Sequence, residues 1–69
     1  ERIAAWLLQE ADSGDTVVLK TNREEQADYL CVARPSLSRT LMQMQKAGLI
    51  EADRKQIRIL DREKLEKIL

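Results

Sequence analysis

Apolar positions recur with a helical period through the first eleven residues of the chain. The buried stripe of this predicted helix, roughly residues 1–11, consists of Ile3, Ala4, Leu7, Leu8 and Ala11. Trp6 lies at the border of the stripe, where it is expected to pack rather than to form a site. The polar run 12–15 ends the helix, with Gly14 as its expected capping glycine. The β-branched segment 16–20 then predicts a strand.

A short second helix is predicted to follow that strand. Asn22 is a good N-cap, and Glu25 lies three residues further on, as in a capping box. The helix is expected to end near Cys31, with Ala27 and Leu30 facing inward. Only three or four residues separate it from the next helical segment, a spacing typical of a helix-turn-helix motif.

The next helix is predicted over residues 35–47. Pro35 suits its first turn because the fixed φ of proline is already helical, and Gly48 suits its end. Its apolar face is made by residues spaced at i, i+4 and i+7, namely Leu37, Leu41 and Met44. The opposite face, at 100° per residue, holds Pro35, Arg39, Met42 and Lys46, flanked by Ser36, Ser38 and Gln43. No acidic residue occurs from Arg34 to Ala47, so this outward face suits a polyanion.

After Gly48 the hydrophobic period changes from helical to alternating. Segments 49–52 and 56–60 predict two strands around a polar turn at 53–55. Asp61 is then expected to cap a terminal helix with Leu65, Ile68 and Leu69 on its apolar side. The predicted fold is therefore mainly α with a small β-sheet, a winged helix-turn-helix formed as one domain over residues 1–69.

The charge of the chain is balanced overall and uneven along its length. Its 69 residues carry a formal net charge of zero. Residues 1–33 hold three basic and seven acidic side chains, a net charge of −4, whereas residues 34–69 hold nine basic and five acidic ones, a net charge of +4. Such a domain can present one basic side despite its neutral total.

The composition argues against several other functions. With one cysteine and no histidine, the chain offers no internal disulfide, no zinc-like ligand set and no histidine base. Its two glycines make no phosphate-binding loop, so we expect no enzymatic activity. No apolar run approaches the roughly 18 residues that a membrane helix needs, and the first residues given do not show a signal-peptide pattern. The chain begins on Glu1 without an initiator methionine, so it is expected to be part of a longer protein.

Nearly the whole chain resembles a known family. The run 27–39 (ADYLCVARPSLSR), the Gly48-Leu49-Ile50 step and the segment 55–59 together resemble the C-terminal DNA-binding domain of Crp/Fnr-type bacterial transcription regulators. This resemblance implies sequence-specific binding of double-stranded DNA, with helix 35–47 in the major groove and the wing turn 53–55 on the DNA backbone.

The resemblance also implies roles for individual residues. Base contacts are expected from Arg34, Ser36 and Arg39. Arg39 is the strongest of these because a guanidinium can pair with guanine O6 and N7, whereas Arg34 could reach a base or a phosphate. Phosphate contacts are expected from Thr21, Asn22, Arg23, Ser38, Gln43, Arg54 and Lys55.

For the complete protein, the resemblance implies a cytoplasmic homodimer. An effector would bind a sensor domain outside this chain, so no cofactor is expected in the domain itself. RNA polymerase is a further implied partner. The isolated fragment is expected to be monomeric or weakly dimeric.

Four positions depart from the family pattern, and one of them is Met42, which puts an apolar residue on the outward face. Pro35 stands where members often carry a base-contacting glutamate, so their target sequences do not transfer. Cys31 occupies a turn position often filled by glycine, where a positive φ would strain the backbone. Gln26 replaces a commonly aliphatic residue, which suggests a thinner packing contact there.

Simpler interpretations remain open for the same residues. Arg34 and Arg39 could be ordinary surface arginines, and the pair Arg54-Lys55 could be only a soluble turn. Cys31 could be a small semi-buried residue or a redox switch. The alternative function is a winged helix that binds an acidic protein partner without reading DNA.

Overall fold

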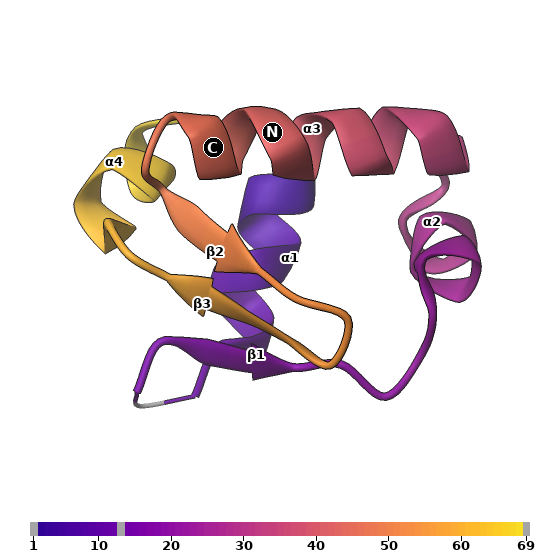
Figure 1. Cartoon of the computed structure of the whole chain (residues 1–69), viewed down its shortest axis with the longest axis horizontal. Helices are drawn as coiled ribbons and strands as arrows, with labels where there is room; N and C mark the ends of the chain where they lie inside the picture. Colours follow the sequence, from indigo (N-terminus) through magenta and orange to yellow (C-terminus); the bar gives the residue numbers. More distant parts are fainter. Residues whose placement is uncertain (1, 13, 69) are drawn as a thin grey trace.

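The computed structural model describes residues 2–12 and 14–68. Its elements follow the predicted order (Figure 1): α1 (Arg2–Glu10), β1 (Thr16–Val18), α2 (Arg23–Leu30), α3 (Arg34–Lys46), β2 (Ile50–Ala52), β3 (Gln56–Ile59) and α4 (Arg62–Lys67). The mainly helical architecture with a small sheet is confirmed. Most elements are a residue or two shorter than the sequence pattern predicts, and β1 ends at Val18 rather than at Lys20.

The three strands form one antiparallel sheet in the order β1-β3-β2. Val17 lies opposite Ile57 and Ile50 opposite Ile59, so the hairpin and the distant first strand share one apolar face. The alternation of β3 places Ile57 and Ile59 inward and Arg58 outward, as the sequence predicts. The predicted hairpin is therefore joined by β1 as a third strand, which pairs with the edge of β3 that β2 leaves open.

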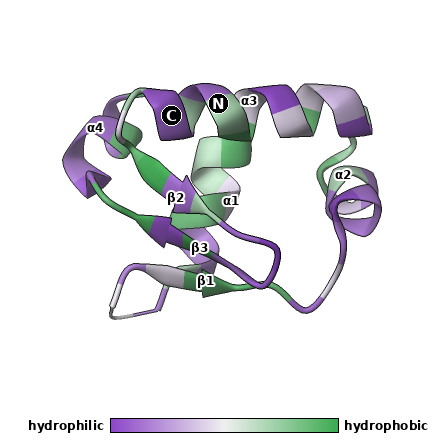
Figure 2. Ribbon diagram, in the orientation of Figure 1, coloured by the Kyte–Doolittle hydropathy of each residue, from purple (hydrophilic) through white to green (hydrophobic). Residues whose placement is uncertain are grey.

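An aliphatic core joins the helices to this sheet. Its buried members are Ile3, Ala4, Leu7, Val17, Ala27, Leu30, Leu37, Leu41, Met44, Leu49, Ile50, Ile57, Ile59 and Leu65. In Figure 2, α1 behind the sheet is mostly hydrophobic, whereas the loop between β2 and β3 is hydrophilic. The apolar faces predicted for the two helices of the motif are confirmed. Trp6 is half-buried against the core, in agreement with its predicted packing role.

Local hydrogen bonds fix the helix ends where the sequence places them. The side chain of Asn22 accepts a hydrogen bond from the Glu25 N–H at 2.9 Å, and that of Asp61 accepts one from the Lys64 N–H at 3.1 Å. At the end of α3, Gly48 has a φ of 77°, and the Leu49 N–H donates to the Met44 carbonyl at 2.9 Å. This is a Schellman motif, in which a left-handed residue ends the helix.

The base of the wing is closed by one backbone carbonyl. The Leu49 carbonyl accepts hydrogen bonds from the N–H groups of Leu60, at 2.8 Å, and Asp61, at 3.2 Å. Leu49, which follows the glycine that ends α3, is thereby joined to Asp61, the residue that caps α4. The hairpin between them begins and ends at the same point of the core.

Two local predictions are wrong. Gly14 does not cap α1, because the helix ends four residues earlier at Glu10, and the Gly14 N–H instead donates to the Asp12 carboxylate at 2.8 Å within the loop. Ile68 does not extend the apolar side of the last helix. It is 41% exposed because α4 ends at Lys67 and the helical period stops with it. Leu69, predicted on the same side, lies outside the described residues.

Cys31 adopts the left-handed conformation that its position in the motif demands. Its φ and ψ are 57° and 41°, and the Val32 N–H donates to the Ala27 carbonyl at 3.0 Å, as in a Schellman motif. The positive φ that would strain the backbone at this position is therefore present. The semi-buried placement is wrong, because a residue that turns the chain out of a helix end stands in solvent, and Cys31 is exposed.

Replacing this residue with glycine is expected to stabilise the domain. Cys31→Gly removes a Cβ that costs roughly 1–2 kcal/mol in the left-handed region, offset in part by the greater freedom of glycine in the unfolded chain. We expect a net gain of about 0.5–1 kcal/mol, measured by thermal and urea unfolding. Cys31→Ala is the matched control and should leave stability nearly unchanged. If both variants show equal stability, backbone strain at this position is disproved.

Candidate nucleic-acid interface

The outward face of α3 is exposed along its whole length. The exposed residues are Arg34, Pro35, Ser36, Ser38, Arg39, Met42, Gln43 and Lys46. On the opposite face, Leu37, Leu41 and Met44 are at most 4% exposed. The core thus holds the helix by one side only, and the predicted base-contacting residues Arg34, Ser36 and Arg39 all stand in solvent.

The amino end of α3 carries free donors. Its N-cap is Ala33, which makes no side-chain capping bond, whereas α2 and α4 are capped by Asn22 and Asp61. Among the described residues, no protein group accepts a hydrogen bond from the N–H groups of Arg34 or Ser36. Backbone donors and the positive end of the helix dipole therefore face outward together, an arrangement that favours an anion.

The cations of the second half of the chain fall into two groups. Arg58, Arg62 and Lys64 form ion pairs with Glu51, Asp15 and Asp61 at 3.7, 2.6 and 4.0 Å. By contrast, no ion-pair partner within the described ranges faces the other six, namely Arg34, Arg39, Lys46, Arg54, Lys55 and Lys67. Four of these six, Arg34, Arg39, Arg54 and Lys55, are the cations of this half that the sequence assigns to DNA. Their charge is left uncompensated on α3 and the wing turn.

Three arginines from separate segments surround one surface hollow. The hollow measures about 390 Å³ and is lined by Asn22, Arg23, Arg34 and Arg54. These residues come from the start of α2, the start of α3 and the wing turn, and none of them is acidic. The fold thereby brings together four of the ten predicted contact residues in a concave basic site.

Arg23 is already engaged inside the protein. Its Nη1 donates to the Gln26 side-chain carbonyl at 3.0 Å, and its Nη2 donates to the Asp53 backbone carbonyl at 3.2 Å. Partial burial lowers the pKa of the guanidinium. Because an arginine has five N–H donors, the predicted phosphate contact is compatible with both bonds and stays a prediction.

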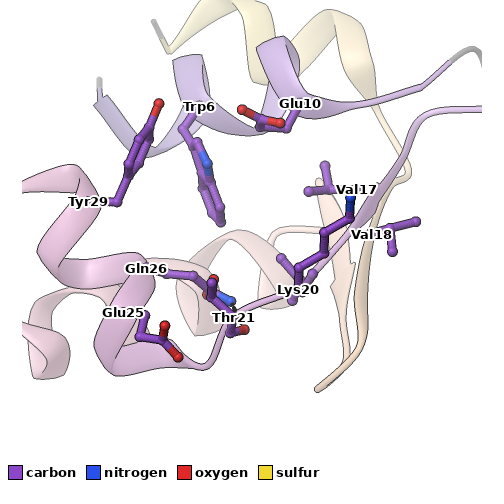
Figure 3. A pocket seen from close by; sticks show the side chains of 10 residues that line it. Trp6, Glu10, Val17, Val18, Lys20, Thr21, Glu25, Gln26 and Tyr29 are labelled. Atoms are coloured by element: carbon purple, nitrogen blue, oxygen red, sulfur yellow. Dashed lines mark hydrogen bonds between the residues drawn. The ribbon is translucent and has the colours of Figure 1, made fainter.

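Gln26 forms a closer contact than the sequence suggests. It is 2% exposed and is the one buried polar residue of the described chain. Its Nε2 donates to the Thr21 backbone carbonyl at 2.7 Å, and Figure 3 shows the side chain directed toward Thr21. The expected thinner contact is wrong, because the amide fills its site and both of its ends are hydrogen-bonded. Helical periodicity treats Gln26 as polar, so it gives no signal of this burial.

A second hollow lies between α1, β1 and α2, and Thr21, one of the predicted phosphate contacts, is part of its lining. It measures about 260 Å³, with Trp6 of α1 and Tyr29 of α2 on one side and Val18 of β1 on the other (Figure 3). Glu10 and Glu25 contribute carboxylates to its lining. No group of three potential metal ligands occurs in the described ranges. None of the helices found at residues 2–12 and 14–68 is long and apolar enough to cross a membrane.

The fold and its basic face together define a class of protein. Two short helices joined by a tight turn, with a hairpin beside the second helix, form a winged helix-turn-helix of the DNA-binding type. The family model of the Crp-like helix-turn-helix domain matches residues 1–68, and the chain belongs to that family. The predicted resemblance is confirmed.

Solved structures agree with this assignment. The CO-dependent transcription factor CooA from Carboxydothermus hydrogenoformans, in its imidazole-bound form, is 27% identical with a TM-score of 0.83, over 96% of this chain and 34% of that one. FixK2 from Bradyrhizobium japonicum is 28% identical with a TM-score of 0.83, over 96% of this chain and 35% of that one. The chain therefore spans about a third of the length of these proteins. No curated protein matches it significantly.

Proposed function

We propose that this domain reads DNA sequence for a bacterial Crp/Fnr-type transcription regulator. In this proposal α3, the predicted helix 35–47, lies in the major groove and the wing turn 53–55 lies on the sugar-phosphate backbone. The observation that carries the proposal is the set of uncompensated cations on α3 and the wing, two of which, Arg34 and Arg54, line a hollow without a described carboxylate. An enzymatic role has no comparable support.

The exposed residues of the first turns of α3 are proposed to contact the DNA bases. Arg39 is proposed to pair with a guanine, since its guanidinium can donate to O6 and N7 together. Arg34 stands at the helix entrance and also lines the basic hollow, so it can reach a base edge or a phosphate. Ser36 has an exposed hydroxyl between them that can donate or accept.

Seven residues on α3 and on the segments near it are proposed to bind the sugar-phosphate backbone of DNA. The proposed phosphate contacts are Thr21, Asn22, Arg23, Ser38, Gln43, Arg54 and Lys55. All of them except the partly buried Arg23 are exposed. The free N–H groups at the start of α3 add donors without sequence preference, which fits contacts that position the protein rather than specify a base.

We further propose that the complete protein acts as a cytoplasmic dimer. Two copies of α3 would then enter successive major grooves about 34 Å apart on a near-palindromic site. An effector would act through a separate sensor domain, so the DNA-reading domain itself would need no cofactor. RNA polymerase is a proposed partner of the assembled complex.

Binding of duplex DNA at two salt concentrations tests the proposal. The three cationic phosphate contacts, Arg23, Arg54 and Lys55, would weaken binding by roughly 40-fold between 50 and 200 mM salt, because neutralised phosphates release counterions. NMR spectra of the labelled domain should show shifts at Arg34, Arg39 and Lys55 when duplex is added. If no duplex shifts these residues even at low salt, the DNA-reading function is disproved. A module for an acidic protein partner would give that result.

A further inference from the structure

The wing is tied to both helices of the helix-turn-helix motif by side chains. From α3, the Gln45 side-chain carbonyl accepts a hydrogen bond from the Ala52 N–H at 2.8 Å. From α2, Arg23 donates to the Asp53 carbonyl at 3.2 Å. Ala52 and Asp53 are consecutive residues where β2 enters the wing turn. Two neighbouring peptide groups of the wing are thus held from two directions.

Gln26 in turn holds Arg23. Its carbonyl oxygen accepts from Arg23 at 3.0 Å, while its amide nitrogen donates to the Thr21 carbonyl at 2.7 Å. Because Gln26 is only 2% exposed, packing fixes its position and limits the positions that the arginine can adopt. Arg23 therefore joins a buried amide of α2 to the backbone of the wing.

We propose that Gln26 is a positioning residue for DNA binding, which it serves by orienting Arg23 against the wing. The inference rests on the proposed function above. Hairpins as short as this wing are marginal on their own, so the position of the wing turn depends on what holds it. Arg54 lines the same hollow as Arg23 and Arg34, so the spacing of these three cations follows the spacing of wing and helices.

The neutrality of Gln26 matters for this role. A carboxylate at the same position would also orient Arg23, but it would cancel one positive charge beside the hollow and weaken the attraction for phosphate. An aliphatic residue would leave the charge and lose the orientation. A buried amide supplies a hydrogen-bond acceptor while the full charge of the guanidinium remains available.

Replacing Gln26 with methionine, a residue of similar length, separates positioning from stability. Gln26→Met removes both side-chain bonds and adds apolar surface to a buried site, so we expect little change in the unfolding midpoint. The Asp53 N–H, which closes the turn by donating to the Gln56 carbonyl at 2.8 Å, should exchange with solvent about three- to tenfold faster. Duplex affinity should fall by about three- to tenfold, and the salt slope should fall by about one.

Two further variants make the test decisive. Gln9→Met, at an exposed position of α1, is the control and should match the original protein in exchange and affinity. Arg23→Lys keeps the charge and cannot bond Gln26 and Asp53 with one planar group, so it should reproduce both effects even if Gln26→Met folds poorly.

The readouts separate this inference from the proposed function. Asp53 exchange is measured without DNA, so it tests the link to the wing even if no duplex binds. Unchanged exchange in both Gln26→Met and Arg23→Lys would overturn the inference. Faster exchange with unchanged duplex affinity would also overturn it, because the wing position would then be irrelevant to DNA.

Discussion

Arg39→Ala is expected to remove most of the preference for one base pair of the target site. The arginine stands exposed on α3 without an ion-pair partner in the described part of the chain, so its guanidinium is free to bond a guanine edge. A bidentate contact of this kind discriminates by about 1–3 kcal/mol, which corresponds to roughly 5- to 150-fold in relative affinity. Competition among duplexes that differ at single positions, all at one salt concentration, measures the change.

Lys55→Ala is the comparison variant, because it removes a proposed backbone contact instead of a proposed base contact. Lys55 lies on the wing turn and is assigned to the backbone, so its loss should weaken every duplex by a similar factor and lower the salt slope by about one. The order of preference among duplexes should stay as in the original domain. If both variants change preference and overall affinity to the same extent, the division between base reading and backbone binding is wrong.

The second large effect is expected from Leu37→Ala, which should come close to unfolding the domain. Leu37 is fully buried and attaches the first half of α3 to the core. Truncating a buried leucine costs about 2–5 kcal/mol. A domain of this size is stable by roughly 3–10 kcal/mol, so one such change removes a large share of the total. Urea unfolding followed by circular dichroism measures the loss.

Met42→Ala is the matched control on the same helix. Met42 is 57% exposed and faces away from the core, so its truncation should change stability by less than about 0.5 kcal/mol. A similar loss of stability in both variants would show that α3 is not held by the face that contains Leu37. The pair therefore tests which side of the helix is free to meet a ligand.

The parts of the fold that sequence alone predicts are those fixed by near neighbours. Asn22 and Asp61 cap helices through bonds to residues three positions away, and Gly48 ends α3 through its own φ. The spacing of apolar residues identifies the buried face of a helix or strand, because that spacing depends only on the geometry of the helix or strand itself. Gly14 shows the limit even here, because a glycine in a polar loop fits several turns and the sequence does not say where the helix before it stops.

The parts that sequence could not predict depend on how distant segments meet. The hydrogen bond from Arg23 to Asp53 joins residues thirty positions apart, and nothing near either residue indicates it. Glutamine is a residue type usually found on the surface, yet Gln26 is buried, and its amide bonds the Thr21 carbonyl in the loop before α2. The basic hollow is a further case, since it exists only when α2, α3 and the wing lie together.

Because the wing is closed at Leu49, the stability of the domain should depend little on the length of the hairpin. Both ends of the hairpin meet at the Leu49 carbonyl. Residues inserted in the turn between β2 and β3 would therefore enlarge a loop whose ends are already held together. The entropy of loop closure rises by only about 0.6 kcal/mol for each doubling of length. Longer wings are thus cheap for folding, but an insertion at the turn would move Asp53 away from Arg23. Variation in wing length among relatives would therefore be limited by DNA binding and tolerated by the fold.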